Sequence, residues 1–130
     1  MTLKILLVDD NLTFMVAVSQ FLTTLPNTQL VGQACDGREA LSKSEQLQPD
    51  LILLDISMPG MNGLEVARCL QEQSHPASVV FLTMHDCPDY RMAAASLGVA
   101  GFVGKSSLAV DLPPIIERLL ANQSGPNISC

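Results

Sequence analysis

Charge is scarce in this sequence, and positive charge is scarcest. Asp, Glu, Lys and Arg make up 15% of the 130 residues, and 13 acidic residues outweigh 7 basic ones to give a net charge of −6. No run of lysine or arginine occurs. Because proteins bind DNA and RNA largely through clustered cations that neutralise phosphates, the chain itself is not expected to bind nucleic acid. The same deficit excludes an anionic membrane surface as a partner.

Long hydrophobic runs and paired cysteines are also missing. No apolar run approaches the roughly 20 residues needed to span a bilayer, and the uninterrupted apolar run before Asp9 has only four residues, too few for a signal peptide. No two of the four cysteines have C-x-x-C spacing, which argues against a zinc site or a redox pair. They are Cys35, Cys69, Cys87 and Cys130. These absences predict a cytoplasmic protein with reduced thiols.

Five short apolar runs alternate with five longer, helix-like stretches. Several runs are continuous rather than alternating, as in strands covered on both faces. The runs are Leu3–Val8, Leu30–Ala34, Leu51–Leu54, Val79–Leu82 and Gly101–Val103. Alternating strands and helices predict a parallel sheet with right-handed crossovers. The expected fold is therefore an α/β, doubly wound, five-stranded parallel sheet flanked by five helices.

Start and stop signals bound the first four helices. The first has one apolar face and ends at Pro26-Asn27. That face consists of Phe14, Ala17, Val18, Phe21, Leu22 and Leu25. The next three are expected from Asp36-Gly37 to before Pro49, from Asn62 or Gly63 to about Gln73, and from Pro88 or Asp89 to Gly98.

The fifth helix is expected to begin near Asp111. This residue is a natural N-cap, and Pro113 and Pro114 then fall in the first turn, where missing N–H groups cost little. Residues 122–130 are rich in Ser, Gly, Pro and Asn and lack apolar periodicity. The domain is therefore expected to comprise residues 1–121, with 122–130 as a tail or the start of a linker.

Polar side chains follow four of the five predicted strands. They are Asp9 and Asp10 after the first, Asp55 after the third, Thr83 after the fourth and Lys105 after the fifth. Ligands of open parallel sheets bind outside the carboxyl ends of the strands, so we expect these side chains to converge there. Three carboxylates close together require a cation or a proton, and Mg²⁺ takes oxygen ligands alongside phosphate. The set predicts phosphoryl transfer to a carboxylate beside a magnesium site.

Each of these residues, taken alone, also has a purely structural interpretation. Asp9 and Asp10 can cap the following helix, and Asp55 can form a turn. Their occurrence together at the ends of several strands of one sheet favours the functional site. Of the two histidines, His75 is expected at the surface, and His85 lies close enough to the site to tune water access.

Four motifs give the chain a family resemblance. They are ILLVDD (Ile5–Asp10), PDLILLDISMPGMNGLE (Pro49–Glu65), VVFLTMHD (Val79–Asp86) and GVAGFVGK (Gly98–Lys105). From about residue 3 to residue 121 the sequence resembles the receiver domain of bacterial two-component response regulators. It is most similar to receivers of the LuxR/NarL type. The resemblance implies a flavodoxin-like fold of receiver type.

The resemblance also implies a metal site and a phosphoacceptor. Asp55 matches the aspartate that is phosphorylated. Asp10, Asp55 and the backbone carbonyl of Ser57 match the direct Mg²⁺ ligands, and Asp9 matches a residue that acts mostly through water.

Further positions match the parts that respond to phosphorylation. Thr83 and Lys105 match the pair that contacts the phosphoryl group, and Thr83 and Phe102 match the switch residues. Pro59 and Gly63 match the turn after the phosphorylation site.

The implied function is a signalling switch. A sensor histidine kinase donates a phosphoryl group to Asp55, and the surface of the fourth helix, fifth strand and fifth helix changes. That surface is expected to bind a second receiver, giving a homodimer, or a DNA-binding output domain outside this chain. The alternatives are a stand-alone receiver, a phosphorylation-independent interaction module and an aspartyl-phosphate phosphatase. The phosphatase is disfavoured because Ser57 stands where such enzymes carry a second carboxylate.

Overall fold

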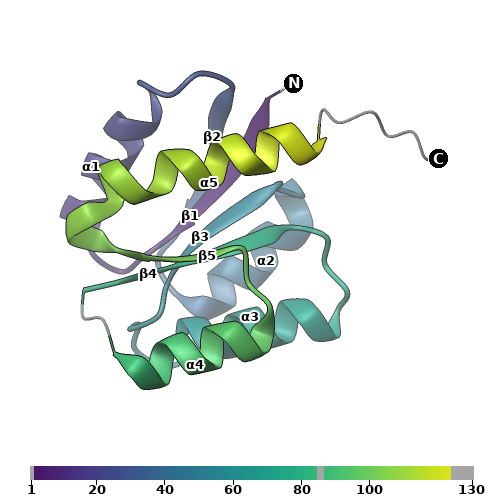
Figure 1. The fold of residues 1–130 in the computed structure, drawn as a ribbon. Helices are drawn as coiled ribbons and strands as arrows, with labels where there is room; N and C mark the ends of the chain where they lie inside the picture. Colours follow the sequence, from purple (N-terminus) through teal and green to yellow (C-terminus); the bar gives the residue numbers. More distant parts are fainter. Residues whose placement is uncertain (1, 85–86, 124–130) are drawn as a thin grey trace.

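The strands of the chain form one parallel sheet between two layers of helices (Figure 1). The computed structural model describes residues 2–84 and 87–123. Its elements are β1 (Leu3–Val8), α1 (Leu12–Leu22), β2 (Thr28–Ala34), α2 (Gly37–Leu47), β3 (Leu51–Asp55), α3 (Gly63–Glu72), β4 (Ser78–Thr83), α4 (Pro88–Leu97), β5 (Gly101–Gly104), a short 3-10 turn (Lys105–Ser107) and α5 (Leu108–Gln123). The strand order is β2-β1-β3-β4-β5, which confirms the predicted fold.

Each face of the sheet carries its own apolar core. The α1 and α5 helices cover one face, and α2, α3 and α4 cover the other (Figure 1). Every residue of β3 is buried, since this strand is central and covered on both sides. The strand order reverses direction between β1 and β3, and at such a switch point the following loops diverge and leave a crevice at the carboxyl ends.

The edge strand β2 contains an irregularity. Ile5 of β1 pairs with Leu30, but Leu6 pairs with Gly32, so Val31 is an extra residue in β2. This two-against-one pairing is a β-bulge. Two residues later, the carbonyl of Gln33 accepts a hydrogen bond from the side chain of a lysine on α2, Lys43.

Caps fix the helix starts and ends that the sequence predicts. The Asp36 side chain accepts a hydrogen bond from the N–H of Glu39 (2.8 Å) at the start of α2. A capping box joins Asn62 and Glu65 at the start of α3. Gly98 ends α4 in the left-handed region, with φ of 66°, a conformation that glycine adopts at little cost.

The predicted start of α5 is wrong. The helix begins at Leu108, directly after the 3-10 turn, and Asp111 lies inside its first turn. The Ser107 hydroxyl donates a hydrogen bond to Asp111 Oδ2 (2.8 Å). Consequently Pro113 and Pro114 fall in the second turn, where each removes one intrahelical hydrogen bond.

The carbonyls that lose those bonds belong to Ala109 and Val110, whose exposure lets water replace the missing donors. At its other end α5 reaches Gln123, two residues past the predicted end of the domain. Residues 124–130, including Cys130, lie outside the described residues. Within the described part of the chain, no helix combines the length and apolar character needed to cross a membrane.

The buried face of α1 is rotated from the predicted one. Met15, Val18 and Leu22 are buried in the core, whereas Ala17 is exposed. At about 100° per residue, Ala17 lies well away from the line joining these three side chains. The other predicted members, including Phe14, pack at the margin of the core.

Candidate functional site

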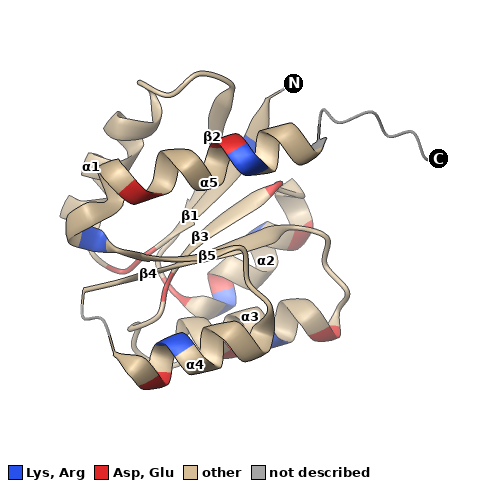
Figure 2. Cartoon of the chain, viewed as in Figure 1, with Lys and Arg blue, Asp and Glu red and all other residues tan. Residues whose placement is uncertain are grey.

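The three predicted carboxylates meet at the carboxyl edge of the sheet. Asp9 and Asp10 follow β1, and Asp55 ends the neighbouring strand β3. One oxygen from each lies within 4.8 Å of the others. Figure 2 shows these acidic segments at the ends of β1 and β3, near the basic segment where α5 begins. The predicted convergence is therefore confirmed for these residues.

Asp9 is completely buried. Its Oδ1 accepts a hydrogen bond from the N–H of Asn11 (2.8 Å). Its Oδ2 receives no hydrogen bond of good geometry from the described residues, and lies 2.7 Å from Lys105 Nζ as an ion pair. A buried carboxylate oxygen held by charge alone remains available to a cation-bound water or to a shifted lysine.

Lys105 reaches this edge from the turn after β5. Its side chain is only 6% exposed, and its Nζ lies 2.7 Å from Asp9 and 3.4 Å from Asp55 Oδ2. The ring centroid of Phe14 lies 4.5 Å from the same nitrogen. The ammonium is therefore enclosed by two carboxylates and one aromatic face, and it sits closer to Asp9 than to Asp55.

Asp55 is buried and electrostatically strained. It is 3% exposed, and its Oδ1 accepts a hydrogen bond from the N–H of Ser57 (3.1 Å). Burial, and then the negative charge of Asp9, raise the pKa of Asp55 to about 6 against the opposing attraction of Lys105. At neutral pH Asp55 is thus an ionised carboxylate at an energetic cost.

Gly63 brings the start of α3 against the end of β3. Its N–H donates a hydrogen bond to the carbonyl of Ile56 (2.9 Å). A Cβ at this position would lie 2.8 Å from the Ile56 Cα and would also meet the Asp55 carbonyl. Only glycine permits this approach, so the turn predicted around Pro59 and Gly63 holds the backbone of Asp55 in place.

Thr83 and Phe102 lie on the adjacent strands β4 and β5. Thr83 ends β4, is 3% exposed and pairs in register with Gly104. Phe102 is half-buried, and the guanidinium of Arg91 on α4 lies 4.7 Å from its ring centroid. Thr83 thus lies next to the strand that carries Phe102 and leads to Lys105. His85 lies outside the described residues.

The acidic cluster has the composition of a magnesium site. Mg²⁺ prefers oxygen ligands, keeps several waters and is bound by one or two carboxylates together with phosphate. Asp9 and Asp55 are buried and Asp10 is exposed, so the cluster has an open side through which water or a phosphoryl group can enter. The donors present fit a hard divalent cation.

Two features of the site escape prediction from the sequence. Strand-end residues predict that Lys105 faces the phosphoacceptor, but they do not predict its closer pairing with Asp9. The only pattern that includes Phe14 is the apolar periodicity of the first helix, which predicts a core position and not a contact with an ammonium. The available signal is its position in the first turn of α1, four residues after Asp10.

Comparison with known proteins agrees with this geometry. The family model of the response regulator receiver domain matches residues 5–117. The nitrate/nitrite response regulator protein NarL of Escherichia coli is 34% identical over 119 residues, covering 92% of this chain and 55% of that protein. A protein-glutamate methylesterase/protein-glutamine glutaminase of Geobacillus kaustophilus is 35% identical over 122 residues, covering 92% of this chain and 35% of that protein.

A solved structure matches the fold at useful sequence identity. It is a two-component response regulator of the LuxR family from Aurantimonas sp. SI85-9A1, with a TM-score of 0.86 and 30% identity, covering 94% of this chain and 87% of that one. The chain spans about half or less of the length of these two curated relatives. With its acidic strand ends and its β2-β1-β3-β4-β5 sheet, the chain belongs to the response regulator receiver domain family.

Proposed function

We propose that this domain is a phosphorylation-controlled switch in which Asp55 accepts a phosphoryl group from a phosphohistidine of a sensor histidine kinase. The observation that carries the proposal is the setting of Asp55. It is a buried carboxylate with a second carboxylate and an ammonium on either side, at the open edge of the sheet. Its pKa of about 6 leaves it ionised, and so nucleophilic, at neutral pH.

In the proposed transfer, a carboxylate oxygen of Asp55 forms a bond to phosphorus while the P–N bond of the phosphohistidine breaks. The imidazole nitrogen leaves with the bonding electron pair. Mg²⁺, held by Asp10, Asp55 and the Ser57 carbonyl and through water by Asp9, would neutralise charge on the transferring group. Lys105, now 3.4 Å from Asp55, moves toward a phosphoryl oxygen.

Thr83 links the phosphoryl group to the rest of the domain. Phosphorylation adds about two negative charges and new acceptor oxygens beside it. When the Thr83 hydroxyl moves to donate to one of them, it vacates space under β5. Phe102, half-buried on β5, turns inward to fill that space and leaves its contact with Arg91.

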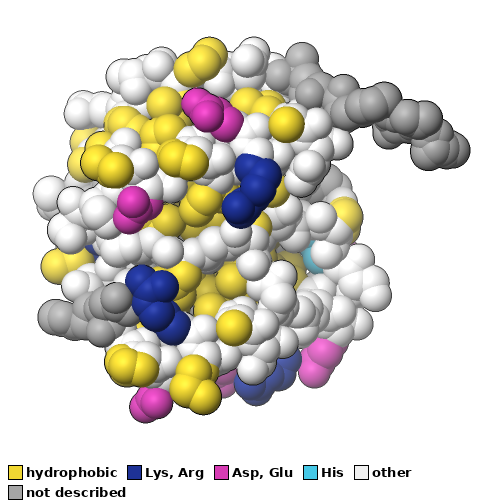
Figure 3. Space-filling view, viewed as in Figure 1, with side chains coloured by type: hydrophobic (Ala, Val, Ile, Leu, Met, Phe, Trp, Pro, Cys, Tyr) yellow, Lys and Arg dark blue, Asp and Glu magenta, His cyan; other side chains and the backbone are white. Residues whose placement is uncertain are grey.

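The surface altered by this movement consists of α4, β5 and α5. It is the face drawn in Figure 3, where hydrophobic side chains appear on and between the two helices. Met92 of α4 is 69% exposed and Val110 of α5 is 73% exposed. We propose this face as the surface that binds a second receiver or an output domain, because exposed apolar side chains favour association.

The output is proposed from the relatives. Similarity to NarL and to a LuxR-family regulator supports a cytoplasmic transcription regulator, whose DNA contacts are made by another domain. Similarity to a methylesterase shows that proteins of this family also include enzymes. We propose that the receiver domain itself acts as a phosphoacceptor, not as an enzyme that turns over an external substrate.

Acetyl phosphate with Mg²⁺ tests the phosphoacceptor. We expect one added phosphoryl group by intact mass, stable in acid and labile to hydroxylamine. Asp55→Ala removes the modification, whereas Asp89→Ala, a change of an exposed aspartate on α4, leaves it. Modification of the Asp55→Ala variant at the parental rate would overturn the assignment. Rapid turnover of phosphomonoesters would instead favour the phosphatase.

The switch has a separate test. Thr83→Ala and Phe102→Ala should each still accept the phosphoryl group but lose the change in self-association that beryllofluoride causes in the parent. A Thr83→Ala variant that responds like the parent would refute this route and leave phosphorylation intact. If beryllofluoride leaves the self-association of the parent unchanged, a phosphorylation-independent interaction module would be favoured.

A further inference from the structure

One aromatic side chain lies against the ammonium at the centre of the site. Phe14 is half-buried in the first turn of α1, and its ring centroid is 4.5 Å from Lys105 Nζ. An ammonium within about 6 Å of a ring face is attracted by the ring quadrupole. We propose that Phe14 is a positioning residue for Lys105, which holds the ammonium over the carboxylates that receive the phosphoryl group.

The contacts around Phe14 form a closed loop. Asp9 Oδ1 accepts from the N–H of Asn11 (2.8 Å), and Asn11 Oδ1 accepts from the N–H of Phe14 (3.0 Å). The Phe14 ring contacts Lys105 Nζ, which lies 2.7 Å from Asp9 Oδ2. The path therefore starts and ends at Asp9. The N-cap of α1 anchors the backbone of Phe14, so the position of the ring is tied to the carboxylate that Lys105 binds.

The ring adds a third electron-rich group to the two carboxylates around the ammonium. A lysine ammonium has three N–H donors, and Asp9 and Asp55 lie 2.7 and 3.4 Å from its nitrogen. The Phe14 face is a third electron-rich group within reach. Because the lysine side chain is only 6% exposed, water competes little for the ammonium, and the attraction of a ring for a cation is stronger when it is desolvated.

This positioning matters when the phosphoryl group arrives, and to that extent the inference rests on the proposed function. Lys105 must then exchange its close contact with Asp9 for a contact with a phosphoryl oxygen on Asp55. With the ring fixed beside it, the ammonium makes a short shift inside the site. An aliphatic side chain would fill similar space without attracting the charge, and Lys105 would spend part of its time turned toward solvent.

The test compares three variants of α1. Phe14→Leu removes the ring, Phe14→Tyr keeps it, and Phe21→Leu changes another half-buried aromatic residue on the same helix. With acetyl phosphate and saturating Mg²⁺, we expect Phe14→Leu to be phosphorylated about three- to tenfold more slowly than the parent. Phe14→Tyr and Phe21→Leu should stay within about twofold of it.

Nuclear magnetic resonance of the metal-free domain measures the contact directly. The Lys105 side-chain protons should be shifted upfield by the ring current in the parent and in Phe14→Tyr, but not in Phe14→Leu. Parental rates in folded Phe14→Leu would overturn the proposal, as would equal slowing in Phe14→Tyr. Phe14→Met serves as the non-aromatic variant if Phe14→Leu does not fold. A parent that accepts no phosphoryl group would refute the proposed function, whereas the ring-current shift would still decide the contact.

Discussion

Polar side chains have opposite roles at the two ends of the parallel strands. We call the end where the strands begin the amino edge and the end where they finish the carboxyl edge. At the amino edge, Asp50 Oδ2 accepts from the N–H of Lys4 (2.8 Å), and His75 Nδ1 accepts from the N–H of Ala77 (3.1 Å). At the carboxyl edge, one buried oxygen of Asp9 receives no directed hydrogen bond from the residues that the structure describes. The amino edge uses side chains to complete the backbone hydrogen bonds of its loops, whereas the carboxyl edge crowds like charges.

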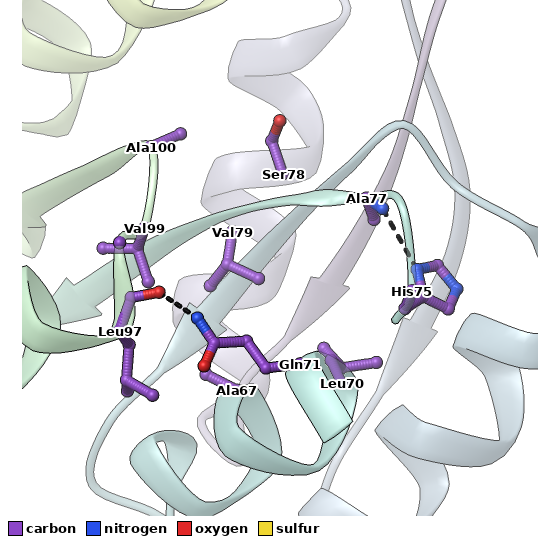
Figure 4. Close-up of a pocket in the computed structure, with 11 residues that line it drawn as sticks. Ala67, Leu70, Gln71, His75, Ala77, Ser78, Val79, Leu97, Val99 and Ala100 are labelled. Carbon is purple, nitrogen blue, oxygen red and sulfur yellow. Dashed lines mark hydrogen bonds between the residues drawn. The ribbon is translucent and has the colours of Figure 1, made fainter. Parts of the chain in front are cut away.

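The amino edge also carries a pocket whose lining residues include no Asp, Glu, Lys or Arg (Figure 4). Gln71 of α3 donates from its side chain to the carbonyl of Leu97 across this pocket, and His75 lies at its rim. The Gln71 bond joins α3 to the last residue of α4, 26 residues away. The comparison teaches that stability and reactivity are assigned to opposite ends of the same strands, as expected where a functional site costs free energy.

Mg²⁺ binding at the carboxyl edge should have the largest effect on stability. The three carboxylates repel one another, which favours binding of a cation to the folded site. By mass action, a ligand that binds only the native state adds about 2.7 kcal/mol at 100 times its Kd. The melting temperature should therefore rise through the millimolar Mg²⁺ range. Asp10→Asn should remove most of the rise, and Asp89→Asn should not. An equal rise in the parent and in Asp10→Asn would place the ion elsewhere.

Breaking the amino edge should cost about 2 kcal/mol. Because His75 Nδ1 accepts from Ala77, Nε2 carries the proton, and it donates to the Ser44 carbonyl (3.0 Å). His75→Ala leaves both backbone groups without these partners, each worth about 1 kcal/mol. Urea unfolding should show a lower midpoint with an unchanged m-value.

His75→Asn is the matched control, since its carbonyl oxygen can replace Nδ1 as acceptor and should recover about half of the loss. Phosphorylation of Asp55 should proceed at the parental rate in both His75 variants. A slowed reaction would mean that the two edges are coupled and not separate.

Removing charge from the carboxyl edge should do the opposite and stabilise the domain. The pKa of Asp55 is raised from 3.8 to about 6 in the metal-free fold. The folded state thus binds this proton more tightly than the unfolded chain does, and stability falls as pH rises from about 4 to about 6. Asp55→Asn should lack this fall and be more stable than the parent by about 1–2 kcal/mol at pH 7.

The measurement is urea unfolding of both proteins at several pH values in the presence of a chelator. Parallel pH profiles for parent and Asp55→Asn would show that the cost of ionisation lies in another group. Added Mg²⁺ should narrow the gap between the two proteins at pH 7.

The smallest effect is expected at Gln71. Its bond to Leu97 is exposed to solvent, so Gln71→Ala should cost less than about 1 kcal/mol. Faster amide hydrogen exchange in residues 97–100 should accompany the change, because the bond fastens this loop to α3. A loss of stability as large as that of His75→Ala would show that this exposed hydrogen bond contributes as much to the free energy of unfolding as the bonds of His75.

The sequence predicted the strands well for a physical reason. A strand such as β3 is buried on both faces, so it appears as an uninterrupted apolar run. The start of α5 was predicted less well, because Ser107 and Asp111 are both residue types that cap helices. They bond to each other, so composition alone cannot say which one stands outside the helix.

Contacts that depend on packing were not predictable. His75 was expected at the surface, but its ring joins Ser44 and Ala77, and the first of these is 31 residues away. Similarly, the strand-end rule brings Lys105 to the acidic residues but cannot rank Asp9 above Asp55 as its partner. That ranking depends on two distances from the Lys105 nitrogen that differ by less than 1 Å. The packing of α1 and of the turn after β5 sets both distances.

The bulge at Val31 has a consequence for how copies of this domain can meet. A regular edge strand offers a row of donors and acceptors to which a second sheet can add, and such addition leads to aggregates that do not readily separate. In β2 the extra residue breaks that spacing, and Lys43 occupies the Gln33 carbonyl. The other outer strand of the sheet, β5, is only four residues long. Pairing with a second sheet is thus disfavoured at both outer strands, β2 and β5. Reversible contacts that respond to a signal are therefore left to side chains on the helices.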